Sequence, residues 1–108
     1  MSQYLLIESR DPFDSPDTDF VHNLSRKLVE GGHEVTVFLV QNGVLPARPC
    51  IHSAALTSLA QAGVTILADD FSLRERGIAA SSLVQGVRAA ALDVVIDGMA
   101  GGAKMIWH

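Results

Sequence analysis

The segment Gly63-Val-Thr-Ile-Leu-Ala-Asp-Asp-Phe-Ser-Leu-Arg-Glu-Arg-Gly-Ile78 determines how the rest of the chain is interpreted. It begins with a short apolar run, residues 64–67, that is typical of a buried strand. The acidic pair Asp69 and Asp70 follows, and a polar turn then opens a short basic helix from about Ser72. In open parallel α/β sheets, ligands bind beyond the carboxyl ends of the strands. Any functional site is therefore expected just after this strand.

Strand-like and helix-like segments alternate before this point. Apolar runs at residues 4–7 and 34–40 predict two more strands with a helix between them. Ser15 is expected to cap that helix, with Pro16 at its first helical position. Gly31-Gly32 end it, because glycine accepts the left-handed conformation needed there. After the second strand, residues 41–49 are expected to be irregular, since they contain two prolines.

The second half continues the alternation. A helix is expected over about residues 51–61. Residues 81–92 fit either one alanine-rich helix or a strand at Val87–Ala90 followed by a helix from Asp93, because short apolar runs do not reveal their period. Lys104–Trp107 predicts a terminal strand. The pattern favours one domain, residues 1–108, with a doubly wound parallel sheet and helices on both faces.

Composition narrows the functional classes. Apolar residues make up 48% of the chain, which fits strands buried on both faces of a sheet or an oligomer interface. The net charge of −4 argues against nucleic acid as a partner. No apolar run reaches the about 18 residues of a membrane helix, and no basic start of a signal peptide is present. The single cysteine allows no internal disulfide, so we expect a cytoplasmic protein.

Polar side chains gather where the predicted strands end. The expected ligand-binding residues are Asp69, Asp70, Ser72, Arg74 and Arg76, with Asn42 and Arg10 contributed by the loops after the other two strands.

Two interpretations of these residues stay open. Asp69 and Asp70 form an acid/base or metal pair, or Asp70 or Ser72 caps a helix from Leu73 while Asp69 is solvated or pairs with an arginine. The two arginines bind an anion beside the helix N-terminus, or they form a solvated face with salt bridges to the aspartates.

Cys50 is the remaining candidate for chemistry. It is expected at the N-cap or first turn of the second helix, where the helix dipole activates a thiol. The alternative is a small apolar filler, which is the usual role of a free cysteine. Cys50 and His52 alone are too few ligands for zinc, so no metal is expected, and no cofactor is predicted.

Taken together, three segments resemble the DsrE/DsrF-like family, which includes the TusD type of sulfur-relay protein. They are Glu30-Gly-Gly-His-Glu-Val-Thr-Val-Phe-Leu-Val-Gln-Asn-Gly-Val44, the opening segment from Gly63 to Ile78, and Gly102-Ala-Lys-Met-Ile-Trp107. The resemblance implies a five-stranded parallel sheet between helices, assembled into trimers or hexamers. It also implies that Val87–Ala90 is the fourth strand and that Asp93 opens the last helix.

The sequence departs from the family pattern at one position. Sulfur-carrying members of the family place a persulfide-forming cysteine just after the third strand, and here Asp69 stands there. The resemblance therefore implies a binding or partner subunit of a sulfur-transfer system, with a sulfur-relay protein as its partner. The alternatives are a small-molecule or anion-binding protein with its site after the third strand, and a sulfur carrier that uses Cys50 instead.

Overall fold

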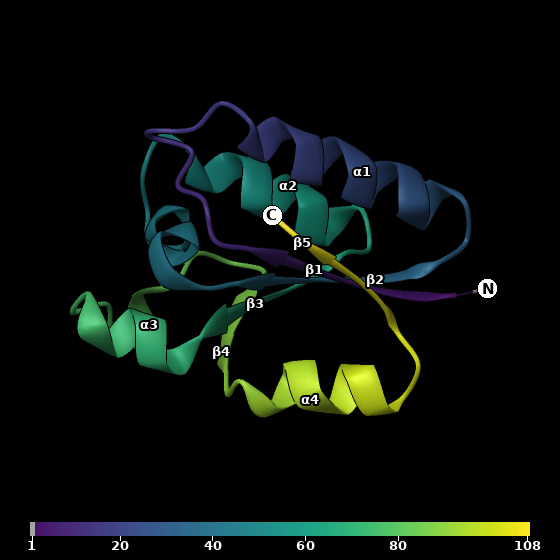
Figure 1. The fold of residues 1–108 in the computed structure, drawn as a ribbon. Coiled ribbons are helices and arrows are strands. Elements are labelled where there is room, and N and C mark those ends of the chain that lie inside the picture. The colour runs from purple at the N-terminus through teal and green to yellow at the C-terminus, as the bar shows by residue number, and fades with distance from the viewer. Residues whose placement is uncertain (1) are drawn as a thin grey trace.

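The computed structural model describes residues 2–108 and arranges them around one parallel sheet (Figure 1). The strands run in the order β4-β3-β2-β1-β5. They are β1 (Gln3–Glu8), β2 (Glu34–Leu39), β3 (Thr65–Asp69), β4 (Val87–Ala90) and β5 (Lys104–Trp107). The helices are α1 (Thr18–Glu30), α2 (Ser53–Gln61), α3 (Asp70–Glu75) and α4 (Asp93–Ala100), with 3-10 helices η1 (Gln41–Ala47) and η2 (Ala80–Ser82).

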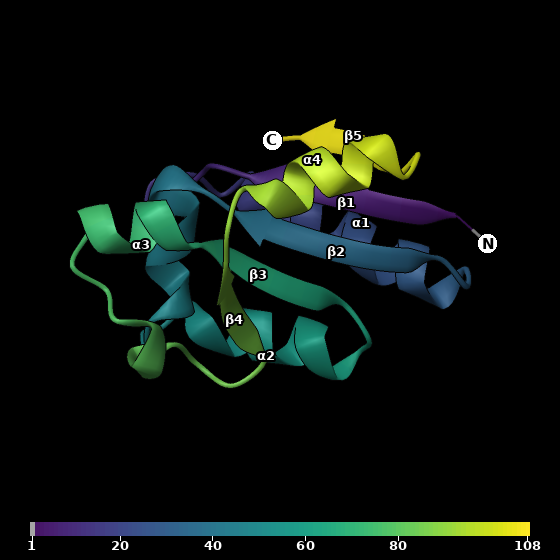
Figure 2. The ribbon, with the colours of Figure 1, turned by 90° about the horizontal axis from the view of Figure 1, so that it is seen from below.

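Helices cover both faces of the sheet, as predicted. Figure 1 shows α1 and α2 on one face and α4 on the other, and Figure 2, seen from below, shows α4 in front of the sheet. Successive strand residues point to opposite faces of the sheet and form two hydrophobic cores. Leu6 and Val37 pack with α1 and α2, whereas Leu5 and Phe38 pack with α4. The face under α4 is the less completely covered one, because no residue of α4 is fully buried.

The last third follows the strand-then-helix interpretation that the family resemblance implied. Val87 pairs with Ile66 of β3, and α4 begins at Asp93. The terminal strand is also confirmed, since β5 pairs with β1 in parallel. Among residues 2–108, no helix is long and apolar enough to cross a membrane.

The predicted start of the first helix is wrong by two residues. Helix α1 begins at Thr18, and the Ser15 side chain does not cap it. Instead, the Ser15 carbonyl accepts hydrogen bonds from the backbone N–H of Thr18 at 3.4 Å and from its hydroxyl at 3.3 Å. This turn gives the Thr18 N–H and hydroxyl a hydrogen-bond partner before the helix begins, so Pro16 lies outside the helix.

Residues 41–47 are also more ordered than predicted, since they form the 3-10 helix η1 despite Pro46. Val44 and Ala47 are fully buried in the larger core, so packing outweighs the proline signal. Gly43 faces the backbone of Glu8 so closely that a Cβ atom would collide with its carbonyl. This close approach places the start of η1 against the end of β1.

Candidate functional site

Asp69 is both the last residue of β3 and the N-cap of α3. Its Oδ2 accepts hydrogen bonds from the backbone N–H of Ser72 at 3.1 Å and from the Ser72 hydroxyl at 2.6 Å. A carboxylate in this position satisfies a donor that the first helical turn leaves open, and it lies at the positive end of the helix dipole. The prediction that Asp70 or Ser72 caps a helix from Leu73 is therefore wrong: Asp69 is the cap, and the helix begins at Asp70.

The Ser72 hydroxyl joins the ends of two neighbouring strands. Besides donating to Asp69, its oxygen accepts the backbone N–H of Gln41 at 2.8 Å. Gln41 lies two residues after Leu39, the last residue of β2, and has a φ of 51°, in the left-handed region that few non-glycine residues adopt. This hydrogen bond holds the turn from β2 into η1. Because the hydroxyl donates one bond and accepts another, it is engaged in structure.

A groove of about 230 Å³ opens beside Asp69. Its charged lining consists of Asp69 and Glu75, and its apolar walls include Phe71, Leu92 and Trp107. Asp69 is only 7% exposed, yet its Oδ1 has no hydrogen-bond partner among residues 2–108. No buried side-chain oxygen of these residues lacks a partner, so Oδ1 is open to solvent. Asp69 therefore has one bonded and one open carboxylate oxygen at the groove.

The two arginines of α3 and its C-cap are held in different ways. Arg76 donates from Nε and Nη2 to Oδ1 of Asn42, at 3.1 and 3.0 Å, and from Nη1 to the carbonyl of Ser72 at 3.2 Å. Arg74 is exposed and lies 3.8 Å from Asp70 in a loose ion pair. The structure thus brings Asn42 to Arg76, and it pairs neither arginine with Asp69.

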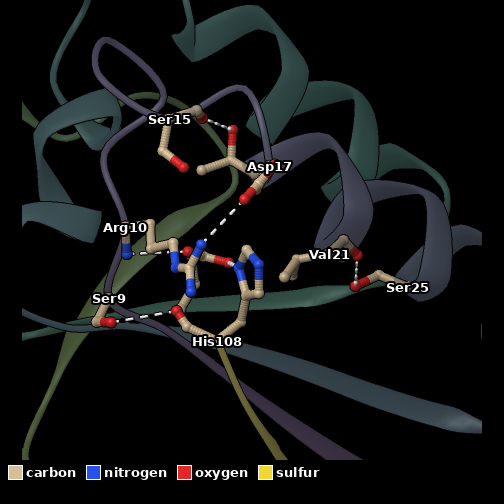
Figure 3. Close-up of polar contacts among 9 residues, drawn as sticks. Ser9, Arg10, Ser15, Asp17, Val21, Ser25 and His108 are labelled. Carbon is tan, nitrogen blue, oxygen red and sulfur yellow. Dashed lines mark hydrogen bonds and ion pairs between the residues drawn. The ribbon is translucent and has the colours of Figure 1, made fainter.

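A second cavity, of about 50 Å³, lies at the end of β1, and sequence reasoning missed it. Glu8 lines it and is 3% exposed; its Oε1 accepts the backbone N–H of Arg10 at 2.9 Å, and its Oε2 lies 2.7 Å from Nδ1 of His108. The Arg10 side chain lines the same cavity and binds Asp17 at 3.0 Å (Figure 3). Arg10 therefore belongs to this cavity, and it does not line the groove beside Asp69.

Burial perturbs two titratable groups at this second cavity. Burial raises the pKa of Glu8 above its ordinary 4.5, although the hydrogen bond with His108 opposes the change. Burial also lowers the pKa of His22 below its ordinary 6.5, against the opposite effect of Asp19. A signal for the Glu8–His108 contact was present, because each residue ends an apolar run. The pairing of the first strand with the last was the missing information.

Cys50 lies three residues before Ser53, the first residue of α2, and His52 is the cap residue. The prediction that it occupies the N-cap or first turn is therefore wrong. The reason is local: the Ser53 hydroxyl donates to the Cys50 carbonyl at 2.8 Å and closes a turn before the helix begins. The Cys50 thiol is half-buried and donates to the carbonyl of Pro46 at 3.9 Å. Cys50 lines neither of the two cavities described above.

Few polar groups remain free at the end of β3. Among residues 2–108, no group of three or more His, Cys, Asp and Glu side chains is arranged to hold a metal ion. At the end of β3, one carboxylate oxygen of Asp69 and the Ser72 hydroxyl are both engaged in the cap of α3. What remains accessible is an open carboxylate oxygen, a second carboxylate and exposed aromatic rings.

Comparison with known proteins places this arrangement in a family. The family model described as DsrE/DsrF-like matches residues 2–107. Among solved structures, the protein of unknown function MTH1491 from Methanobacterium thermoautotrophicum is similar, with 18% identity, a TM-score of 0.87 and coverage of 100% of both chains. The ychN protein from E. coli matches with 18% identity, a TM-score of 0.81 and 100% of both chains.

A third solved structure, the conserved protein of unknown function BT1422 from Bacteroides thetaiotaomicron, is 18% identical with a TM-score of 0.78, over 98% of this chain and 95% of that chain. At this identity, the three likenesses show the fold alone. No match was found among curated proteins. Because the family model spans nearly the whole sequence, this chain belongs to the DsrE/DsrF-like family.

Proposed function

We propose that this chain is a binding or partner subunit of a sulfur-transfer or sulfur-metabolism system and that it does not itself carry sulfur. The observation that carries the proposal is the state of Asp69. This residue stands where the family pattern has its persulfide-forming cysteine, and a carboxylate cannot carry sulfane sulfur. Its Oδ2 is committed to the backbone and hydroxyl of Ser72, so the side chain serves to shape the loop.

A subunit that works through contacts needs surface for them, and α4 provides it. Ile96 and Met99 lie three residues apart on this helix and are both exposed, while Val94 and Val95 pack toward the sheet. Large exposed apolar side chains on one helix face are typical of protein interfaces. We assign this face, Ile96 and Met99, to contact with a second copy of the chain in a homo-oligomer, a trimer or hexamer as the family resemblance implies.

Two alternatives are less well supported. Anion binding would need free guanidinium groups, but Arg76 is bonded to Asn42 and to the Ser72 carbonyl, and Arg74 is in a loose ion pair with Asp70. Sulfur transfer through Cys50 would need an accessible thiol, and this thiol is half-buried and turned to a backbone carbonyl.

Intact mass spectrometry after incubation with glutathione persulfide tests the proposal. The wild-type chain is expected to gain no sulfur. An Asp69→Cys, Cys50→Ser variant restores a thiol after β3 and is expected to gain one sulfur atom, which controls for the competence of the donor. If the wild type gains one sulfur atom and the Cys50→Ser variant does not, Cys50 is a carrier and the proposal is wrong.

A further inference from the structure

The groove beside Asp69 has an acidic lining and aromatic walls. Asp69 and Glu75 are the charged residues that line it, and no lysine or arginine does. The pair between Glu75 and Arg76 is loose, with 3.9 Å between nitrogen and oxygen, which exceeds hydrogen-bonding distance. Glu75 therefore has only this loose ion pair, and Asp69, a side chain that is more than nine-tenths buried, has no ion-pair partner among residues 2–108.

The aromatic residues have the exposure that a cation-binding site requires. Trp107 is 69% exposed and Phe71 is 58% exposed, and both line the groove together with Leu92. A cation above the face of such a ring is attracted by the ring quadrupole, and tryptophan binds most strongly. Rings of this size are costly to leave in water, so their exposure at an acidic groove needs a reason.

The size of the groove limits its occupant. Its volume of about 230 Å³ is well above the ~30 Å³ of one water molecule. It is below the roughly 300–1,000 Å³ of pockets that enclose a cofactor or a drug-sized ligand. One long side chain with a charged end fits this volume, and the exposed apolar rim then remains for its neighbours.

We propose that this groove binds a lysine or arginine side chain presented, beside an apolar residue, by a segment of another protein. Asp69 Oδ1 and Glu75 receive the cation, Trp107 and Phe71 flank it, and Leu92 packs against the apolar neighbour. The inference rests on the proposed function, because a partner subunit needs a docking point, and charge complementarity identifies its chemistry. A free amine would leave the apolar rim uncovered, which favours a protein segment.

Trp107 is the only tryptophan of the chain, so its fluorescence reports on this groove. The full chain is titrated with the peptide acetyl-Gly-Leu-Arg-Leu-Gly-amide, with its Lys, Gln and Glu counterparts, and with butylammonium chloride. The Arg and Lys peptides are expected to bind at least about tenfold more tightly than the Gln peptide, with an affinity that falls as salt rises. The Glu peptide and butylammonium are expected to bind more weakly than both.

Charge-removing variants with a matched control locate the effect. Asp69→Asn keeps a capping oxygen, since asparagine caps helices as well as aspartate does, and it is expected to weaken Arg-peptide binding about tenfold. Glu75→Gln, on the exposed side, is expected to weaken it about threefold. Glu30→Gln removes an equal charge from the end of α1 and is expected to change nothing.

Equal binding of the Arg and Gln peptides, or no Arg-peptide binding up to about 1 mM, would overturn the inference. Butylammonium binding as tightly as the peptides would overturn the protein segment as the occupant. These outcomes are separate from failure of the proposed function, which is measured as a Cys50-dependent gain of sulfur. Each result can therefore be assigned to one proposal alone.

Discussion

Removing the Ser72 hydroxyl is the sharpest single test of how the site is held together. This hydroxyl donates to Asp69 at 2.6 Å and accepts the Gln41 N–H at 2.8 Å, and Ser72 is 3% exposed. Ser72→Ala removes both bonds and adds no bulk. It therefore disconnects the cap of α3 from the left-handed turn after β2 in one step.

The magnitude follows from the two bonds. A hydrogen bond to a charged group contributes about 1.5–3 kcal/mol, which applies to the Asp69 carboxylate. The Gln41 N–H is partly buried and can regain a water, so its loss costs about 1 kcal/mol. Alanine's better helix propensity returns about 0.5 kcal/mol. We expect Ser72→Ala to lower the free energy of unfolding by about 2–3.5 kcal/mol.

Urea unfolding followed by far-UV circular dichroism measures this difference. Ser82→Ala is the matched control, because the Ser82 hydroxyl donates to a backbone carbonyl at 2.8 Å on an exposed turn. Its effect is expected to stay within about 0.5 kcal/mol. If Ser72→Ala loses no more stability than Ser82→Ala, the hydroxyl does not hold the two strand ends together, and the structural role assigned to Ser72 is wrong.

Three further predictions concern other parts of the chain. Because burial raises the pKa of Glu8 above 4.5, the folded state keeps this proton at pH values where the unfolded chain has released it. The unfolding free energy of the wild type, relative to that of Glu8→Gln, is therefore expected to be highest below pH 4.5 and to fall as pH rises through the raised pKa of folded Glu8. A difference between the two proteins that is constant between about pH 4 and pH 8 would contradict this. Gly43→Ala forces a Cβ against the Glu8 carbonyl and is expected to cost about 1–3 kcal/mol in urea unfolding, whereas an effect under about 0.5 kcal/mol would show that the backbone yields freely. Light scattering at micromolar concentration is expected to show a mass well above 11.5 kDa for the wild type and a shift toward monomer for Ile96→Ser, Met99→Ser, and a monomeric wild type would remove the oligomer proposal.

The layered fold was predictable because its signals are local and repeated. Strands β1, β2, β3 and β5 each contain a short apolar run, and Gly31-Gly32 ends α1 with Gly32 at a φ of 86°, as expected of a left-handed residue. Helix starts were less predictable, since backbone turns competed with the capping side chains at Ser15 and before Ser53. The ambiguity at Val87–Ala90 was not resolved by periodicity. It was settled by pairing with β3, a contact that no local pattern encodes.

For the candidate site, the location was predictable from the sequence but the side-chain partners were not. The sequence placed Asp69 at the end of a strand, and parallel strands bring such ends to one edge of the sheet, so the location was predictable. Which of the predicted residues lie together was not predictable: Arg10 lines the cavity of Glu8, and Asn42 accepts hydrogen bonds from Arg76. Those partners depend on which strands are neighbours. Glu8 and His108 are 100 residues apart and meet because β1 lies beside β5.

The residue at which α3 begins explains why Asp69 has its particular geometry. A helix that begins at Asp70 needs a cap at the position before it, and that position is the last residue of a buried strand. The capping carboxylate is therefore buried, and one of its oxygens accepts a hydrogen bond from the first turn of the helix. The other oxygen is left at the groove together with Glu75 and the aromatic rings. A cysteine at this position would leave the cap donors without a strong acceptor, since a thiol is a weak one. On the proposed function, a carboxylate at the position of the family's cysteine gives a negative charge in place of a reactive thiol, and we propose that this charge serves recognition at the groove.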